Sequence, residues 1–181
     1  MFCGTFPFSS PTHIMLREGY IMLYNSYYDR LAAVAYALRW AYDRNPRYYD
    51  FEDIGGDCTN FVSQCLFAGC RTMNYSQNNG WFYIDQAQRS PSWTGVAFLK
   101  EFLLTNTGTG VYGAEADLSE LSAGDIILLE NSNGTPYHAV IVSSVMFPPV
   151  PENIRICSHS FDRRNEPLTV YDYRYAQGIK I

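Results

Sequence analysis

Apolar residues recur at helical spacing along the first half of the chain. Between residues 28 and 45 they fall at intervals of three and four, as on one face of a helix, at Leu31, Val34, Ala35, Leu38, Ala41 and Tyr42. Asp29 is suited to cap this helix. Asn45-Pro46 is expected to end it, because the residue before a proline disfavours helical geometry. We therefore predict one helix over residues 28–45.

A second helical pattern covers residues 58–69 and places Phe61, Val62, Cys65 and Leu66 on one face. Gly69 follows the last apolar residues and is suited to stop the helix. Residues 70–95 are irregular and rich in Asn, Ser and aromatic side chains, which is typical of surface loops that carry function. Helical spacing returns over residues 94–106, which predicts a third helix.

Short runs of β-branched and apolar residues replace the helical pattern after Gly110. They cover residues 125–129, 139–142, 154–157 and 168–171. Turn residues separate them at Gly124-Asp125, Asn133-Gly134 and Pro148-Pro149. Helices first and strands later predict an α+β domain, in which N-terminal helices pack on a C-terminal antiparallel β-sheet.

The first residues differ in character from the rest of the chain. Residues 1–21 hold two prolines and scattered aromatic side chains without a clear period. We expect an N-terminal extension here, either a disordered arm or the product of a start codon assigned too early, with Met22 as the initiator. Residues 22–181 are expected to form a single domain, since domains commonly hold about 100–200 residues.

Composition and charge exclude several classes of protein. The 181 residues are 47% hydrophobic and only 17% charged, unlike a disordered chain. The net charge of −5 argues against nucleic acid as a partner, because binding phosphates requires a surplus of Lys and Arg. No apolar run approaches the ~18 residues of a membrane span, and no signal peptide is visible, so the chain as written is expected in the cytoplasm.

Cys58 is the most promising nucleophile among the five cysteines. It follows Gly55-Gly56 and falls in the first turn of the second predicted helix. Unpaired N–H groups and the helix dipole favour a thiolate there, which predicts a lowered pKa for Cys58. Cys65 and Cys70 are expected to be small buried hydrophobic residues. Their spacings of seven and five do not suit a zinc site with Cys58, so no metal or cofactor is expected.

Two histidines lie where they can serve a nucleophilic thiol. His138 opens the run over residues 139–142, and His159 follows the run over residues 154–157. If these runs form antiparallel neighbours, both histidines come to the same end of the hairpin. A cysteine at a helix N-terminus, a histidine on a strand and a polar group on the next strand supply a nucleophile, a base and an orienting group for acyl transfer.

The stretch GGDCTNFVSQCLFAGC resembles the bacterial Putative amidase domain, together with the preceding YDRLAAVAYALRWAYDRNPRYYDF and the later segments Ser92-Trp93, Gly124-Asp125 and YHAVIV. This family is related to the NlpC-type and CHAP cell-wall hydrolases of the papain-like cysteine peptidase group. The resemblance covers roughly residues 26 to 175. It implies a papain-like, NlpC-type fold and a cysteine amidase or peptidase that acts on a peptide or amide, such as a peptidoglycan stem peptide.

The resemblance also implies roles for individual residues. Cys58 corresponds to the nucleophile, which attacks an amide carbonyl and forms a thioester, and His138 to the base that is paired with it as an imidazolium. His159 corresponds to the group that orients the base, with Asp162 as its rival. Asp57 is expected to cap the helix by bonding N–H groups of the turn after Cys58, or to position substrate.

Aromatic side chains around such a site are expected to line a substrate groove. The candidates are Tyr48, Tyr49, Trp81, Tyr83 and Trp93.

Two other functions remain open from sequence. The same Cys/His pair serves a thiol acyltransferase or transpeptidase, and a domain without catalysis serves as a cell-wall or protein-binding module. By analogy with the family, a secreted or wall-associated location is an alternative to the cytoplasm.

Overall fold

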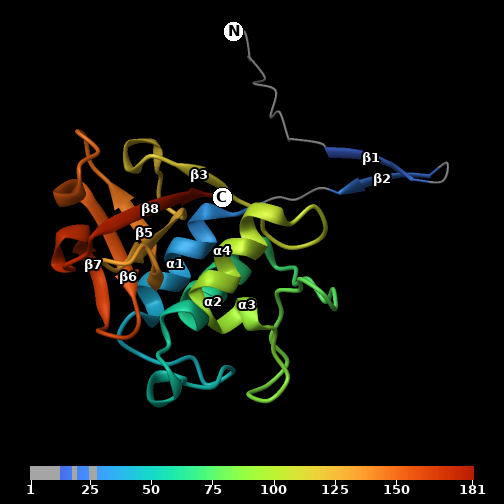
Figure 1. The fold of residues 1–181 in the computed structure, drawn as a ribbon, viewed down its shortest axis with the longest axis horizontal. Helices are drawn as coiled ribbons and strands as arrows, with labels where there is room; N and C mark the ends of the chain where they lie inside the picture. The colour runs from blue at the N-terminus through green and yellow to red at the C-terminus, as the bar shows by residue number, and fades with distance from the viewer. Residues whose placement is uncertain (1–12, 18–19, 25–27) are drawn as a thin grey trace, which may run out of the picture.

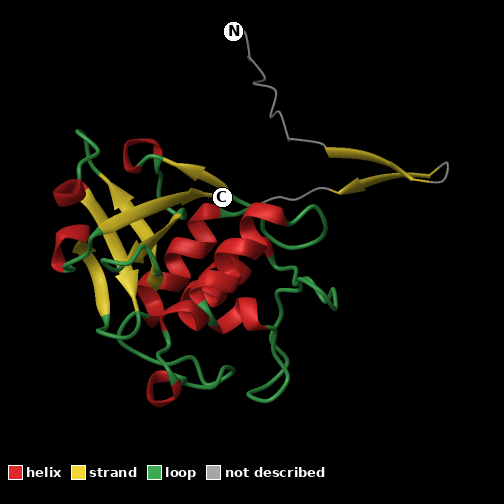
Figure 2. Cartoon of the chain, viewed as in Figure 1, coloured by secondary structure: helices red, strands yellow, loops and turns green. Residues whose placement is uncertain are grey.

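Helices and an antiparallel sheet form two layers, with the helices packed on one face of the sheet (Figures 1 and 2). The computed structural model describes residues 13–17, 20–24 and 28–181. The helices are α1 (Arg30–Trp40), α2 (Cys58–Cys70), α3 (Pro91–Thr94) and α4 (Val96–Thr105). Short 3-10 turns are η1 (Glu52–Ile54), η2 (Leu118–Glu120), η3 (Pro151–Asn153) and η4 (Leu168–Val170).

The sheet has six strands in the order β3-β8-β4-β5-β6-β7, and every neighbouring pair is antiparallel. The strands are β3 (Ala114–Ala116), β4 (Ile126–Glu130), β5 (Pro136–Val145), β6 (Ile154–Ser158), β7 (Arg163–Pro167) and β8 (Tyr175–Lys180). The predicted α+β class and antiparallel sheet are therefore confirmed. A separate two-stranded sheet pairs β1 (His13–Arg17) with β2 (Tyr20–Tyr24), and β2 crosses the boundary between residues 21 and 22 that the sequence predicted.

The first helix is shorter than predicted and buries another face. Asp29 caps it as expected, accepting a hydrogen bond from the Ala32 backbone N–H at 2.9 Å. The helix ends at Trp40, where a turn begins with the Asp43 N–H donating to the Trp40 carbonyl. Its buried positions are alanines, including Ala33 and Ala37, whereas Leu31 is 82% exposed. Small side chains let α1 approach its neighbours closely, which the period of the larger apolar residues does not reveal.

Helix α2 is the central element of the helical layer. Its predicted apolar face is confirmed, because Phe61, Val62, Cys65 and Leu66 are all fully buried. The helix continues past Gly69 and is ended by Arg71, which adopts left-handed geometry at φ 57°. Gly69 serves a packing role instead, since a methyl group there would overlap the Tyr28 ring.

Three predicted strands are confirmed and one is wrong. Residues 168–171 form the turn η4, with Leu168 packed in the core on the sheet face opposite the helices. The strands missed on either side are β7 and β8. Strand β7 has the polar sequence RRNEP and lies at an edge of the sheet, where one face and one edge meet water. Its position in the sheet, and not its composition, makes it a strand.

Asp125 ties the beginning of the domain to its end. Its carboxylate is fully buried and accepts hydrogen bonds from Arg30 Nη1 at 2.7 Å, from the Ser122 N–H at 2.8 Å and from the Ile181 N–H at 2.9 Å. Arg30 also donates to the carbonyl of Ile181. One buried carboxylate therefore joins the start of α1, the turn before β4 and the C-terminus.

We predict that Asp125→Ala lowers the free energy of unfolding by about 3 kcal/mol, because it removes the partner of a partly buried charge and of two backbone N–H groups. The matched control is Asp43→Ala. This deletes the carboxylate of an exposed ion pair with Arg39 and should cost no more than about 0.5 kcal/mol. Urea unfolding of both variants checks the difference, and equal losses would contradict the role of Asp125.

Candidate active site

Cys58 is the first residue of α2 and lies beside the start of β5. The preceding turn uses Gly55 and Gly56, both at φ 99°, a geometry that other residues rarely adopt. The sulfur lies 3.7 Å from Thr59 Oγ1, and the backbone of Ala139 also hydrogen-bonds to it. Cys58 is therefore held against the residue that follows His138.

Burial controls the acidity of Cys58. The residue is 7% exposed, and this desolvation raises the pKa of its thiol above the ordinary value. Hydrogen bonds from Ala139 and Thr59 lower the pKa by a smaller amount, and the Asp57 charge raises it further. The expected lowering of the Cys58 pKa by the helix N-terminus is thus overturned, because the loss of hydration outweighs it.

His138 lies near the start of β5 and is 4% exposed. Its Nε2 is buried and has no hydrogen-bond partner among the described residues. Burial lowers the pKa of His138 to about 4, so the imidazole is neutral at neutral pH. Within the described part of the chain, no hydrogen bond joins His138 to Cys58. The unliganded site thus holds a thiol and a neutral imidazole, and not the expected thiolate–imidazolium pair.

His159 lies at the same end of the sheet as His138, as the pairing of Ile141 with Cys157 requires. Both of its ring nitrogens are occupied elsewhere. Nδ1 lies 2.6 Å from Asp57 Oδ2, and Nε2 lies 2.9 Å from the Trp40 carbonyl oxygen. The structure therefore places His159 against Asp57, the residue before Cys58, and not in hydrogen-bond contact with His138.

The rival orienting group, Asp162, also has another partner. Its two carboxylate oxygens accept hydrogen bonds from Arg44 at 3.0 and 3.1 Å. Arg44 follows α1, so this pair joins the end of the first helix to the turn after β6. Among the described residues, no hydrogen bond, ion pair or ring contact joins either predicted candidate for the third position to His138.

Asp57 occupies the N-cap position of α2 without forming a side-chain cap. Its Oδ1 accepts hydrogen bonds from the Phe51 N–H at 3.0 Å and from Asn60 Nδ2 at 2.8 Å. The expected bonds to N–H groups of the turn after Cys58 are therefore replaced by a bond to the preceding loop. Asp57 is fully buried, which separates it from solvent and from any substrate that does not displace protein groups.

The predicted groove aromatics divide into buried and exposed groups. Trp81 and Trp93 are fully buried, and their indole N–H groups donate to Ser63 Oγ at 3.0 Å and to Asn60 Oδ1 at 2.9 Å. They are core residues that support α2, which corrects their expected place in a substrate groove. Tyr49 is 39% exposed on the loop before α2 and is accessible from solvent.

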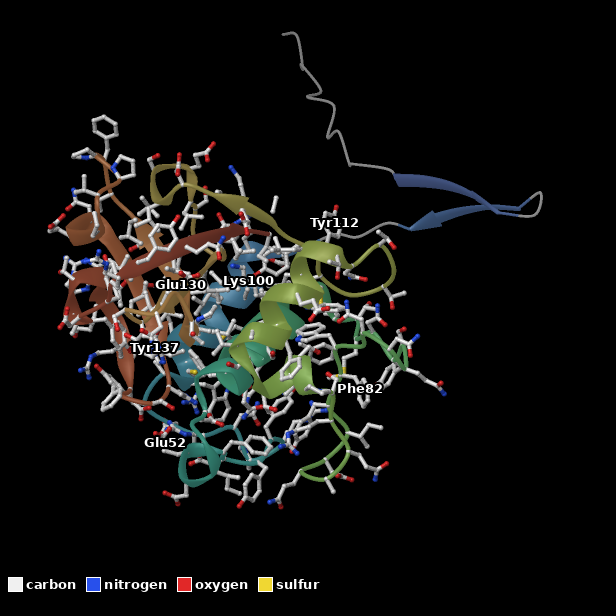
Figure 3. All side chains as sticks on the ribbon, in the orientation of Figure 1. Glu52, Phe82, Lys100, Tyr112, Glu130 and Tyr137 are labelled. Atoms are coloured by element: carbon white, nitrogen blue, oxygen red, sulfur yellow. The ribbon has the colours of Figure 1, made fainter. Side chains whose placement is uncertain are left out.

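The molecule presents the candidate site between a loop and a strand end. Figure 3 labels Glu52 of η1 and Tyr137 of β5, which both lie on the left side of the view, with Glu52 below Tyr137. Two further polar residues near this end of the sheet, Tyr171 and Ser158, were not predicted from the sequence. The Tyr171 ring lies 4.8 Å from the His138 ring, and its hydroxyl is 2.6 Å from Ser158 Oγ. Tyr171 was missed because residues 168–171 read as a strand.

The described residues hold no group of three or more His, Cys, Asp or Glu side chains suited to a metal ion. The four cysteines within residues 28–181 are free thiols. Within the described ranges, none of the helices combines the length and apolar character that crossing a bilayer requires.

Comparison with known proteins relates the chain to one family and to a bacterial relative. A family model described as Putative amidase domain matches residues 27–181. A protein of Bacillus subtilis (strain 168), "Uncharacterized protein YhbB", is 40% identical to this chain over 119 residues. The alignment covers 64% of this chain and 37% of that relative, so the chain spans well under half of the relative's length. No solved structure matches the chain.

Acid is expected to destabilise the fold through His138. Its pKa is about 4 in the folded chain against an ordinary 6.5, so between these values the unfolded chain binds a proton that the folded chain does not. The free energy of unfolding should fall by up to about 3 kcal/mol as the pH drops through this window.

His138→Gln should remove this part of the pH dependence. Urea unfolding at about pH 7 and about pH 4.5 measures the slope in both proteins. An unchanged slope in the variant would contradict a buried neutral His138.

Proposed function

We propose that this chain, which belongs to the Putative amidase domain family, is a cysteine-dependent amide hydrolase. Cys58 is the nucleophile and His138 is the base. The observation that carries the proposal is the placement of Cys58 at the first residue of α2, with its sulfur against the backbone of Ala139, the neighbour of His138. A nucleophile and a base at one point of the fold are what amide cleavage through a thioester requires.

The protonation state of the resting site favours general-base catalysis. His138 is neutral and has an unpartnered Nε2, so it can take the Cys58 proton as the sulfur attacks the amide carbonyl. The C–N bond then breaks while the imidazolium returns the proton to the leaving amine. Water, deprotonated by the same imidazole, hydrolyses the thioester and regenerates the thiol. The hydrogen bond between a catalytic nucleophile and its base is often long without substrate and shortens when substrate binds.

The N-terminus of α2 supplies the natural place for an oxyanion. The first backbone N–H groups of a helix have no intrahelical partners, and the helix dipole favours negative charge there. The Cys58 N–H is therefore our candidate donor to the tetrahedral intermediate. Removing one such donor typically costs about 10²–10³ in kcat.

The resemblance to the family also supports a proposal for the type of fold and for the class of substrate. Helices that precede an antiparallel sheet, with the nucleophile at a helix start and the base on a strand, support a papain-like, NlpC-type fold. By the same analogy the substrate is a peptide, such as a peptidoglycan stem peptide. Exposed Tyr49, on the loop before α2, is the groove residue that remains accessible to it.

Activity should depend on both residues. Cys58→Ala and His138→Ala should each lower hydrolysis of a purified peptidoglycan stem peptide by about 10⁴-fold or more, because the members of such a unit act together. Cys70→Ala, at the far end of α2, is the matched control and should retain activity. The measurement is product release by mass spectrometry, with thermal melting to confirm folding.

Three results would redirect the proposal. Full activity in Cys58→Ala would exclude a cysteine mechanism. Transfer of the acyl group to an added amine, in preference to water, would identify a transferase that uses the same pair. A wild-type Cys58 that neither reacts with substrate nor alkylates would favour a binding module.

A further inference from the structure

A buried carboxylate lies directly beside the candidate nucleophile. Asp57 precedes Cys58 in the chain and is fully buried, and its partner His159 is 1% exposed. An uncompensated charge in such a place is costly. A second anion next to it is costlier still, so formation of a thiolate at Cys58 depends on what neutralises Asp57.

The hydrogen bonds of His159 fix one of its protons. The Trp40 carbonyl oxygen only accepts, so Nε2 at 2.9 Å carries a proton and donates it. The second nitrogen, Nδ1, lies 2.6 Å from Asp57 Oδ2, which is the short separation of a charge-assisted pair. The proton between them belongs either to the imidazole or to the carboxylate.

Donors around Asp57 favour the ionised carboxylate. Oδ1 accepts from the Phe51 N–H and from Asn60 Nδ2, two groups that only donate in these bonds. Arg44 Nε lies 3.8 Å from Oδ2. A carboxylate that accepts several hydrogen bonds is stabilised in its charged form, which leaves the shared proton on His159.

Arg44 alone does not neutralise Asp57, because it is shared. Its guanidinium also lies 3.3 Å from Asp50, 3.8 Å from Glu52 and 3.0 Å from Asp162. Four carboxylates therefore surround one arginine. His159 supplies the second positive charge, and it is the one in direct contact with Asp57.

We propose that His159 is a positioning residue, held as an imidazolium by Asp57 and the Trp40 carbonyl, and that it offsets the Asp57 charge so that Cys58 can give up its proton to His138. The inference rests on the proposed function and assigns His159 a partner other than His138. Other titratable or charged groups lie around the site on several elements: Arg44 after α1, Asp50 before η1, Glu52 in η1, His138 on β5, Asp162 after β6, Arg163 at the start of β7, and Tyr171 after η4.

A charge cycle tests this role through the pH midpoint of Cys58 alkylation by iodoacetamide. His159→Gln leaves Asp57 uncompensated and should move the midpoint up by about one pH unit, which slows alkylation about tenfold on the acid side. Asp57→Asn removes the anion and should leave the midpoint near that of the wild type. The double variant Asp57→Asn/His159→Gln has no charge in the pair and should restore the midpoint.

Asp162→Asn is the control, because it alters the Arg44 cluster without touching the Asp57–His159 pair. It should not move the midpoint. A double variant that stays as slow as His159→Gln would overturn the counter-ion role and favour a direct action of His159 on His138. Melting curves identify any variant that fails to fold.

A second measurement does not depend on the thiol. In protein labelled with ¹⁵N-histidine, both His159 nitrogens should show imidazolium shifts at about pH 7, assigned by their loss in His159→Gln. Shifts of a neutral tautomer would overturn the proposal. An unreactive Cys58 together with an imidazolium His159 would overturn the proposed function and leave the charged pair established.

Discussion

The buried pair of Asp57 and His159 joins segments that are far apart in the chain. Through Asp57 it holds the loop before α2, and through the Trp40 carbonyl it holds the end of α1. Burying these groups is tolerable because both His159 nitrogens and both Asp57 carboxylate oxygens have hydrogen-bond partners. The start of α2, and with it Cys58, is located by this pair.

Burial of Cys58 and His138 favours the neutral thiol and neutral imidazole over a thiolate–imidazolium pair. It raises the pKa of Cys58 and lowers that of His138, so the proton stays on sulfur in the resting state. Because the thiolate is the reactive form of cysteine, a thiol that keeps its proton reacts slowly with electrophiles. In the proposed mechanism the proton leaves sulfur during the attack, so the neutralisation of the Asp57 charge matters more than it would beside a preformed thiolate.

Two buried tryptophans support helix α2 from the core. Trp81 and Trp93 lie against each other with ring centroids 4.9 Å apart, and each donates its indole N–H to α2. Asn60 accepts the hydrogen bond of Trp93 through Oδ1 and donates one to Asp57 through Nδ2. The aromatic richness of the chain therefore supports the first turn of α2 from inside, in addition to any contact with substrate.

The sequence by itself determined the α+β class, three of the helices with the Asp29 cap on the first, three of the strands, and the position of His138 and His159 at the same end of neighbouring strands. These follow from local periodicity, turn residues and the geometry of antiparallel neighbours. Only the tertiary structure decided which face of α1 is buried, that β7 is a strand in spite of its polar residues, and what His159 binds. Hydrogen-bond partners and desolvation depend on segments remote in the chain, and no local pattern encodes them.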